Sequence, residues 1–441
     1  MYFTYFNGEG CKPLCDDRQM PQPLPALKLG PPHPQGPAAV ITRRAADRLR
    51  EGAVWVYRSD IEQLLPAPSS TAVDPGSILT ILDSRRIPLG SATYSSASQI
   101  TLRLISSEPT LTRDRYLQLI AERVEAALTL REALAPTTAE NNAHRLIFSE
   151  ADQLPGIVAD RYNDLIILQL LTQSTAQDDV RAILTPVLRE RLAPATIVER
   201  PDPRIRVAED LPFVASESLY ANRESAKLAT TFTINGLHFA YDATAGQKTG
   251  AFLDQRLNYA AAAAYAHGTA LDICTYQGGF ALHLAQSCER VTGVDTSRAA
   301  LEVADANLAL NPHLQAKSDW IEADAFDLLR EFESTGRRFD TIVLDPPAFA
   351  KSKRATEGAV RGYKELNLRA LKMLAPGGTL VTCSCSHHVL APDFQAIVAA
   401  AAADAHRRVQ LLESRGAAPD HPAILTLPET SYLKCLLCRV D

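Results

Sequence analysis

Residues 229–441 predict a doubly wound, Rossmann-like α/β sheet, and two observations support this fold class. Apolar runs of strand length alternate with segments whose apolar residues recur at helical spacing, as in parallel sheets covered by helices. Acidic or glycine-rich turns follow several of these runs, where ligands bind in such folds. The preceding residues predict two smaller units, a β-barrel and an α+β unit.

Composition places the chain among ordinary globular proteins. It has 441 residues, 46% hydrophobic and 22% charged, which excludes collagen-like, coiled-coil and fully disordered classes. No apolar run approaches the roughly 18 residues of a membrane span, and the first residues lack a secretory signal. Eight cysteines are too few for a disulfide scaffold at this length. We therefore expect a cytoplasmic protein of several domains with no membrane association.

The chain divides into four segments with different patterns. Residues 1–37 contain eight of the 28 prolines and predict an extended, disordered tail. Residues 38–108 combine short strands with turn sequences, which predicts a small β-barrel. Residues 109–228 predict a central α+β domain, and residues 229–441 form the large sheet.

Individual elements follow from the same periodicities. In the two smaller units, helices are predicted over 42–50, 111–134 and 178–192, and strands over 53–61, 77–83, 88–95, 99–106, 144–150, 156–162 and 165–171. In the large sheet, strands are predicted over 270–274, 291–295, 319–323, 340–345 and 378–384, and helices over 280–287, 297–310, 326–333 and 361–374.

Acidic residues at three strand ends of the large sheet suggest a nucleoside site. Asp272 lies in the first strand and the next turn holds Gly278 and Gly279, where a ligand can approach the backbone closely. Asp295 would accept hydrogen bonds from both ribose hydroxyls, and Asp324 would face an adenine amino group. Each acid alone is typical of a helix cap or turn, but their order favours a cofactor site. Without GxGxxG or a basic residue in the turn, a dinucleotide is disfavoured and S-adenosylmethionine fits.

The fourth and fifth strands carry candidate catalytic residues. The sequence LDPPAF holds Asp345 in a rigid turn, and Phe349 there would stack on a planar base taken out of its helix. Cys385 ends the fifth strand, near Asp345 if the two strands are neighbours. Such a thiolate suits methylation of cytosine carbon 5, because its addition to carbon 6 makes carbon 5 nucleophilic. Asp345 would bond the base nitrogen N3.

Residues around Cys385 have other expected roles. Cys383 is expected to pack as a small apolar residue. His387 is expected to favour the thiolate of Cys385 or to contact phosphate, and its adjacent His388 argues against a zinc pair because the two side chains point apart. No metal site is expected, and no residue stands out as the base that removes the carbon 5 proton.

Two basic stretches suggest a polyanionic partner although the net charge is -6. One contains Arg43, Arg44 and Arg48, and the other begins with Lys351 and Lys353 beside the LDPPAF turn. Solvated helix faces are the alternative explanation for both runs. We expect these residues to contact RNA phosphates.

Several stretches resemble the RlmI-type bacterial methyltransferases that make 5-methylcytosine in 23S rRNA. They are QKTGAFLDQR, LDICTYQGGFALHLA, GVDTS, LDPPAFAKSK, GYKELNLRA, GGTLVTCSCSHH and DHPAILTLPETSYLK. The similarity runs from about residue 38 to 441, and GSATYSSASQITLRL is similar to that family's PUA domain, a small RNA-binding barrel. Residues 1–37 have no counterpart in the family pattern.

The resemblance implies an S-adenosylmethionine-dependent enzyme that acts on rRNA with Cys385 as its nucleophile. It implies that the segment 247–256 closes over the cofactor. The cofactor-binding residues that it implies, together with those expected from the strand ends, are Asp272, Tyr276, Gly278, Gly279, Phe280, Asp295, Asp324, Asp254 and Gln255.

The sequence leaves two other functions open. An acidic residue before Pro-Pro-aromatic also suits methylation of an exocyclic base amine, which needs no thiol. The second alternative is a non-catalytic RNA-binding or ribosome-assembly protein on the same fold. The target cytosine, the choice between naked rRNA and an assembled particle, and the oligomeric state, a homodimer included, are not decided by the sequence.

Overall fold

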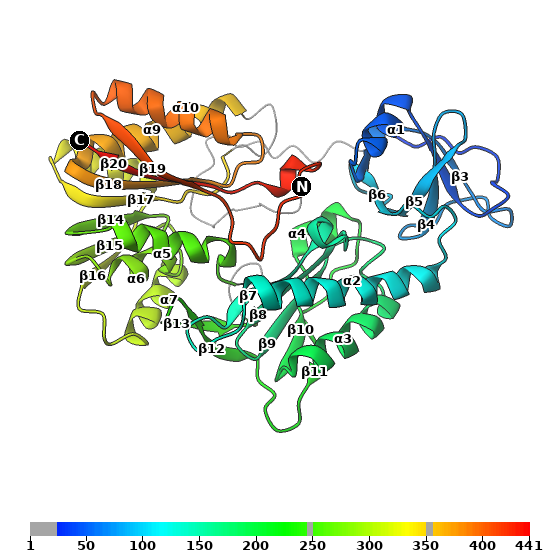
Figure 1. Ribbon diagram of the computed structural model, residues 1–441, viewed down its shortest axis with the longest axis horizontal. Helices are drawn as coiled ribbons and strands as arrows, with labels where there is room; N and C mark the ends of the chain where they lie inside the picture. The colour runs from blue at the N-terminus through cyan, green and yellow to red at the C-terminus, as the bar shows by residue number, and fades with distance from the viewer. Residues whose placement is uncertain (1–23, 245–249, 350–355) are drawn as a thin grey trace.

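The computed structural model describes residues 24–244, 250–349 and 356–441, which form three main β-sheets with helices packed on them (Figure 1). A six-stranded sheet comes first in the chain, a five-stranded sheet follows, and a seven-stranded sheet forms the last part. The predicted fold class is confirmed, since the last sheet is a mainly parallel, doubly wound α/β sheet. None of the helices within the described ranges is long and apolar enough to cross a membrane.

The six-stranded sheet has the strand order β2-β6-β5-β4-β1-β3. Its elements are β1 (Ala38–Ile41), α1 (Arg43–Arg50), β2 (Trp55–Tyr57), β3 (Ile61–Leu65), β4 (Ile78–Leu82), β5 (Pro88–Tyr94) and β6 (Ile100–Ser106). The single strand expected over 53–61 is instead divided, because the short helix η1 (Arg58–Asp60) turns the chain between β2 and β3. This turn directs the buried carboxylate of Asp60 toward α1, where Arg44 and Arg48 bind it.

Residues 24–37 lie along the edge of this sheet, which corrects the expectation of a disordered tail for that part of 1–37. The Gly30 amide donates to the Leu64 carbonyl, and the Leu64 amide donates to the Lys28 carbonyl. Because β3 is an edge strand, its free backbone groups can bind an extended segment even where prolines interrupt that segment.

The five-stranded sheet follows with the order β11-β10-β9-β8-β7. Its strands are β7 (Ala143–Phe148), β8 (Ile157–Tyr162), β9 (Leu165–Leu170), β10 (Thr196–Glu199) and β11 (Glu217–Ala221). Helices α2 (Arg113–Leu134) and α3 (Asp178–Leu192) share its apolar core, and α4 (Pro203–Ala208) follows β10. A separate hairpin of β12 (Ala229–Ile234) and β13 (Leu237–Asp242) packs between this sheet and the next one.

The seven-stranded sheet has the order β16-β15-β14-β17-β18-β20-β19. Its strands are β14 (Thr269–Ile273), β15 (Arg290–Asp295), β16 (Lys317–Glu322), β17 (Phe339–Leu344), β18 (Leu374–Ser384), β19 (Val409–Arg415) and β20 (Lys434–Val440). Its helices are α5 (Arg256–Tyr265), α6 (Gly279–Leu284), α7 (Arg298–Ala309), α8 (Ala325–Ser334), α9 (Thr356–Met373) and α10 (Ala391–Asp404).

The strand order of the large sheet determines where a ligand can bind. The first five strands are parallel, whereas β20 runs antiparallel to both β18 and β19. The chain leaves β14 toward β15 on one side and returns to β17 on the other, so β14 lies at the topological switch point. The carboxyl ends of β14, β15, β17 and β18 therefore meet at one edge of the sheet.

A buried polar junction joins the six-stranded sheet to the five-stranded one. Arg103 on β6 is buried, with its guanidinium 3.8 Å from the carboxylate of Glu150 and 3.3 Å from that of Glu209. Trp55 donates its indole N–H to Glu150 at 3.0 Å. Because the acids come from the second unit and Arg103 and Trp55 from the first, these contacts fix the two units relative to each other.

Residues 416–433 between β19 and β20 connect all three sheets. Leu427 packs against Trp55 of the first sheet, and Tyr432 packs against Phe148 of the second. Asp420 accepts hydrogen bonds from the Arg145 amide and the Arg256 guanidinium. Figure 1 shows this segment in red, extending from the large sheet toward the other two.

The junction predicts a large loss of stability in the Arg103→Met variant. This change leaves Glu150 buried without its cation and removes the guanidinium that donates to Glu209, which should cost about 3–5 kcal/mol of unfolding free energy. Urea unfolding at pH 7 measures this change. The control is Arg43→Met, whose side chain is 89% exposed and should shift stability by no more than about 0.5 kcal/mol. Equal unfolding curves for the two variants would show that the junction does not hold the sheets together.

Candidate active site

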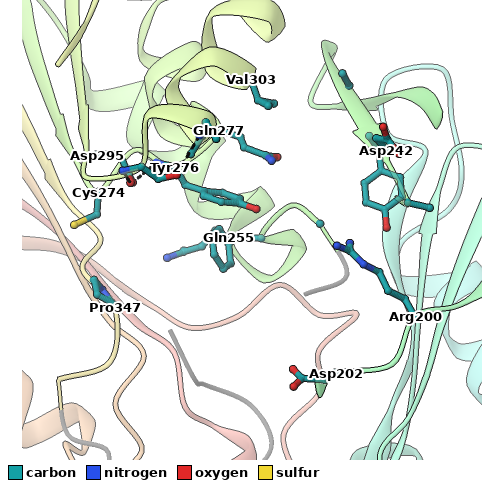
Figure 2. Close-up of a pocket in the computed structure, with 18 of the residues that line it drawn as sticks. Arg200, Asp202, Asp242, Gln255, Cys274, Tyr276, Gln277, Asp295, Val303 and Pro347 are labelled. Carbon is teal, nitrogen blue, oxygen red and sulfur yellow. Dashed lines mark hydrogen bonds between the residues drawn. The ribbon is translucent and has the colours of Figure 1, made fainter. Parts of the chain in front are cut away.

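A cleft of about 1500 Å³ opens at the carboxyl edge of the seven-stranded sheet. Figure 2 shows Cys274, Tyr276, Asp295 and Pro347 on its large-sheet side, with Arg200 and other central residues across the opening. Asp254, Gln255, Asp345 and Cys385 line the same cleft. Residues from five strand ends, Glu322 of β16 included, and from the central unit therefore share one solvent-accessible space.

The turn after β14 is strained and exposes its backbone to the cleft. Cys274 and Tyr276 both have positive φ angles, 64° and 52°, which non-glycine residues rarely adopt. Asp272 stabilises this turn, because its Oδ2 accepts a hydrogen bond from the Thr275 hydroxyl at 2.6 Å. Burial raises the pKa of Asp272 to about 7. The Asp272 side chain is fully buried and does not line the cleft, so its place is beneath the turn rather than against a ligand.

Asp295 lies at the end of β15 and faces the cleft. One carboxylate oxygen accepts from the Tyr276 amide and the other from the Ser297 amide, each at 2.9 Å. These bonds join the turns after β14 and β15. Burial raises the pKa of Asp295. Each carboxylate oxygen has a second lone pair, so Asp295 can still accept hydrogen bonds from ligand hydroxyls.

Asp324 has a different role from the one predicted. Its carboxylate caps α8 by accepting from the Phe326 amide at 2.9 Å and the Asp327 amide at 3.2 Å. Ala323 and Ala325 line the cleft, whereas the Asp324 side chain does not. The contact expected with adenine is therefore not supported by the geometry, and the ordinary preference of aspartate for helix N-caps accounts for this residue.

The glycine turn is constrained by packing as well as by its nearness to the cleft. A Cβ atom on Gly278, at φ 84°, would lie 2.6 Å from Leu282, and one on Gly279 would lie 2.6 Å from Tyr259. Phe280 packs edge-on against Tyr259. Gly279 and Phe280 line a small cavity beside the cleft rather than the cleft itself.

The turn after β17 places Asp345 in the cleft, as predicted. Gln255 Nε2 donates to its Oδ2 at 3.0 Å. Burial, followed by the negative charge of Asp254, raises the pKa of Asp345 to about 8. Asp345 therefore keeps its proton at neutral pH and can donate it.

Phe349 does not line the cleft. Its ring packs against Tyr363, with 4.7 Å between the centroids, and contributes to the apolar core under α9. The prediction that Phe349 stacks on a base is therefore wrong for this arrangement. Pro346 and Pro347 line the cleft instead.

Cys385 follows β18 and is half-buried at the cleft, as predicted. Its Sγ lies 3.9 Å from the carbonyl oxygen of Pro346, the residue after Asp345. Its other contacts include the apolar cluster of Phe148, Tyr432 and Leu433. Cys383, two residues earlier, is fully buried opposite Cys435 on β20, and burial raises its pKa well above 9. Of the two cysteines, Cys385 is the one that a substrate can reach.

His387 does not supply the positive charge that the sequence suggested. Its Nδ1 lies 3.0 Å from the Glu429 carbonyl, and burial lowers its pKa to about 3. The imidazole is therefore neutral at physiological pH.

Sequence reasoning missed the role of Tyr432. Its hydroxyl donates to Asp254 Oδ2 at 2.5 Å, while the ring packs against Cys385. Tyr432 belongs to one of the stretches that resemble the family. Its contact with Asp254 could not be predicted from a local sequence pattern, because the two residues are 178 positions apart.

Some of the basic residues predicted to bind RNA already pair with acidic residues of the protein. Arg44 and Arg48 both pair with Asp60, at 2.9 and 2.5 Å, and Arg43 lies 3.7 Å from Asp47. The side chains of Arg43 and Arg44 are nevertheless 89% and 75% exposed. Lys351 and Lys353 lie outside the described residues, as do positions 247–249 of the segment expected to close over the cofactor. Within the described ranges, no group of three or more His, Cys, Asp or Glu residues is arranged to hold a metal ion.

Comparisons with known proteins agree with this arrangement. The model of the S-adenosylmethionine-dependent methyltransferase family matches residues 156–439, and that of the PUA-like domain matches residues 40–107. A solved S-adenosylmethionine-dependent methyltransferase from Streptococcus mutans has a TM-score of 0.75 at 18% identity and covers 94% of this chain and 100% of its own. A second structure with the same figures is a methyltransferase complexed with SAH.

Among methyltransferases, the chain is similar over most of its length to proteins named for their action on ribosomal RNA. Ribosomal RNA large subunit methyltransferase I of Erwinia tasmaniensis is 37% identical over 389 residues, covering 88% of this chain and 95% of that protein. The protein of the same name in Shewanella amazonensis is 38% identical over 390 residues, with the same coverage.

The family and fold together define an S-adenosylmethionine-dependent methyltransferase with an N-terminal PUA-like domain. Within that class, the chain belongs to the ribosomal RNA large subunit methyltransferase I family.

The cleft suits S-adenosylmethionine, the cofactor of this class. The carboxylates of Asp254, Asp295 and Glu322 line it, so it is rich in hydrogen-bond acceptors. A ligand with a sulfonium, an ammonium group and two ribose hydroxyls complements such a surface.

The position of Asp295 predicts that it contributes to cofactor affinity. Asp295→Ala should weaken S-adenosylmethionine binding by about 1–3 kcal/mol, because ribose hydroxyls lose a charged acceptor. Isothermal titration calorimetry with the cofactor measures the change. Asp319→Ala is the control, since that carboxylate on β16 is half exposed and pairs with Arg290. Unchanged affinity in Asp295→Ala would exclude a ribose contact by this residue.

Proposed function

We propose that this protein transfers a methyl group from S-adenosylmethionine to carbon 5 of a cytosine in 23S rRNA, through a covalent bond to Cys385. The relatives named above act on large-subunit ribosomal RNA according to their names, which supports this class of substrate. The observation that carries the carbon 5 chemistry is that Cys385 and Asp345 line one cleft.

The cofactor would occupy the part of the cleft formed by the turns after β14 and β15. Asp295 would accept from the ribose, and the backbone of the 274–277 turn would lie against the nucleoside. Asp254 and Gln255 line the neighbouring wall and would enclose the reactive end. When bound, S-adenosylmethionine supplies an electrophilic methyl group on its sulfonium sulfur.

Cys385 would make the target carbon nucleophilic. Its thiolate sulfur bonds to carbon 6, and the electron pair of the carbon 5–carbon 6 double bond moves toward N3 and carbon 5. After carbon 5 has gained its methyl group, its proton passes to a water molecule, the electron pair of that C–H bond restores the carbon 5–carbon 6 double bond, and the carbon–sulfur bond breaks to release the thiolate. N3 then returns to Asp345 the proton that it took up.

Asp345 would stabilise the charge that develops on the ring. Because its pKa is about 8, it carries a proton at neutral pH and can donate it to N3 as Cys385 adds to carbon 6. Gln255 holds the carboxyl group through its 3.0 Å hydrogen bond, which fixes the direction of that donation.

The PUA-like domain and the basic residues would bind the RNA around the target. Exposed Arg43 is best placed for a phosphate contact. Arg44 and Arg48 pair with Asp60, and this carboxylate would weaken their attraction for phosphate. Lys351 and Lys353 follow the Pro-Pro turn in sequence, which would bring them near the same strand of RNA.

Covalent catalysis predicts a trapped complex. RNA that carries 5-fluorocytosine at the target should form a stable adduct in the presence of S-adenosylmethionine, because fluorine cannot leave carbon 5 as a proton does. Denaturing gel electrophoresis and mass spectrometry detect the adduct. Cys385→Ser should abolish it, since a serine hydroxyl is scarcely ionised at neutral pH.

Cys383→Ser is the matched control for this experiment. The thiol of Cys383 is fully buried, so its loss should leave the adduct intact. An adduct that requires Cys383 instead of Cys385 would show that Cys383 is the nucleophile and that the proposed role of Cys385 is wrong. Active methylation with no adduct would favour transfer to an exocyclic amine, for which Asp345 before Pro-Pro is also suited.

The raised pKa of Asp345 predicts a loss of activity in alkaline solution. The acid is mainly protonated at pH 7 and loses its proton as the pH rises through about 8, so kcat should fall on that side. Asp345→Asn should reduce kcat by about 100-fold or more and remove this alkaline limb, because an amide cannot transfer the proton. Methyl transfer to RNA measured from pH 6 to 10 tests both effects. An alkaline limb that persists in Asp345→Asn would assign it to another group.

A further inference from the structure

Lys434 lies directly beside the proposed nucleophile. It is the first residue of β20, which pairs antiparallel with β18, and it stands opposite Ser384 in that pairing. Ser384 is the last residue of β18 and immediately precedes Cys385. The register of these two strands therefore brings Lys434 and Cys385 together across 49 residues of sequence.

The ammonium group of Lys434 is held between the two segments that flank Cys385. Nζ donates to the Ser386 carbonyl and to the Tyr432 carbonyl, both at 2.7 Å. Ser386 follows Cys385 in the chain, and Tyr432 packs against the Cys385 side chain. Lys434 thus ties together the loop that carries the thiol and the segment that covers it.

Among the residues that the structure describes, Lys434 has no carboxylate partner of the kind that normally accompanies a buried cation. The residue is 6% exposed, and no carboxylate in the described ranges forms an ion pair with it. Two neutral carbonyls satisfy hydrogen bonds but do not neutralise a charge, so burying this ammonium is costly unless an anion faces it. A thiolate at Cys385 would be that anion.

The tyrosines and the histidine around this pair are neutral near pH 7, whereas the charged groups beyond them are Asp254, bonded to the Tyr432 hydroxyl, and Arg145, paired with Asp160. Burial raises the pKa of Tyr363 on α9 and of Tyr432, so both keep their protons. His387, which faces Lys434 and Tyr432, has a pKa of about 3. Burial lowers the pKa of Lys434 to about 8, and negative charge on Cys385 acts in the opposite direction. Lys434 is therefore mainly an ammonium group at pH 7.

We propose that Lys434 is a positioning residue for methyl transfer, whose buried ammonium group favours the thiolate of Cys385 and fixes the loop that carries it. The role rests on the proposed function of Cys385 as nucleophile. The attraction is reciprocal: a thiolate favours the ammonium form of Lys434, and the ammonium favours the thiolate by the same free energy.

The test is the pH dependence of Cys385 alkylation in the full-length protein without RNA or cofactor. Iodoacetamide reacts with thiolates, and mass spectrometry of peptides separates Cys385 from Cys274, which also lines the cleft. In K434M and K434Q the midpoint pH of Cys385 alkylation should rise by about one unit. Below both midpoints, the rate should then fall about tenfold relative to the wild type. An unchanged midpoint in folded K434M and K434Q would overturn the proposal.

Two further variants separate charge from structure. K434R keeps the positive charge and should keep a midpoint close to that of the wild type, and a shift as large as that of K434M would overturn the proposal. K364M is the control, because it removes a partly exposed ammonium group that pairs with Asp404 and should not move the midpoint. A shift in K364M as large as that in K434M would count against a local effect.

A second measurement remains if neither K434M nor K434Q folds. The NMR titration of the ¹³Cε-labelled lysine then compares the wild type with Cys385→Ser. Loss of the thiolate should lower the titration midpoint of Lys434, and equal midpoints would overturn the proposal. These experiments need no RNA, whereas the adduct experiment does. A midpoint shift without an adduct would thus refute the nucleophile while leaving the interaction of Lys434 with Cys385 established.

Discussion

The antiparallel pairing of β18 with β20 is the constraint on which the proposed chemistry depends. Cys383 stands opposite Cys435 and Ser384 opposite Lys434, so the register fixes both the buried cysteine and the lysine beside the reactive one. Both faces of β20 are buried, Cys435 and Leu437 in one core cluster and Leu436 and Cys438 in another, so a slip of one residue would exchange the two sets. Packing in these two clusters therefore selects the register, and the register places Tyr432 and Lys434 next to Cys385.

The second organising feature is the accumulation of acids at one sheet edge. Asp272, Asp295 and Asp345 follow three strands whose carboxyl ends meet, and burial is the first cause of the raised pKa of each. Hydrogen bonds offset part of the free energy lost when these carboxyl groups are buried. Asp272 accepts from Thr275, Asp295 accepts from the amides of two turns, and Asp345 accepts from Gln255. A cationic cofactor in the cleft would lower this cost for Asp295, which lines the cleft, since positive charge nearby favours the ionised form. Folding and cofactor binding are thus coupled through Asp295.

The sequence predicted the fold more fully than the directions of its side chains. Apolar runs located the five parallel strands, and strand ends correctly brought Asp345 and Cys385 to one cleft. A strand end gives a residue's position but not its partner, and so Asp324 could not be recognised as the cap of α8. Phe349 is likewise drawn into the core by Tyr363, a contact across the fold that local pattern does not encode.

The segment 416–433 contacts both the PUA-like domain and the cleft. Leu427 packs on Trp55 of the first sheet, while Tyr432 at the other end of the segment bonds Asp254 and covers Cys385. The buried Arg103 junction holds the first sheet from its other side. With the two sites held by apolar packing and by buried charge, an RNA bound to both must match their spacing in its own shape. Selection of the target by RNA shape would then follow from rigidity between the sites, and base contacts in the cleft need only distinguish cytosine from its neighbours.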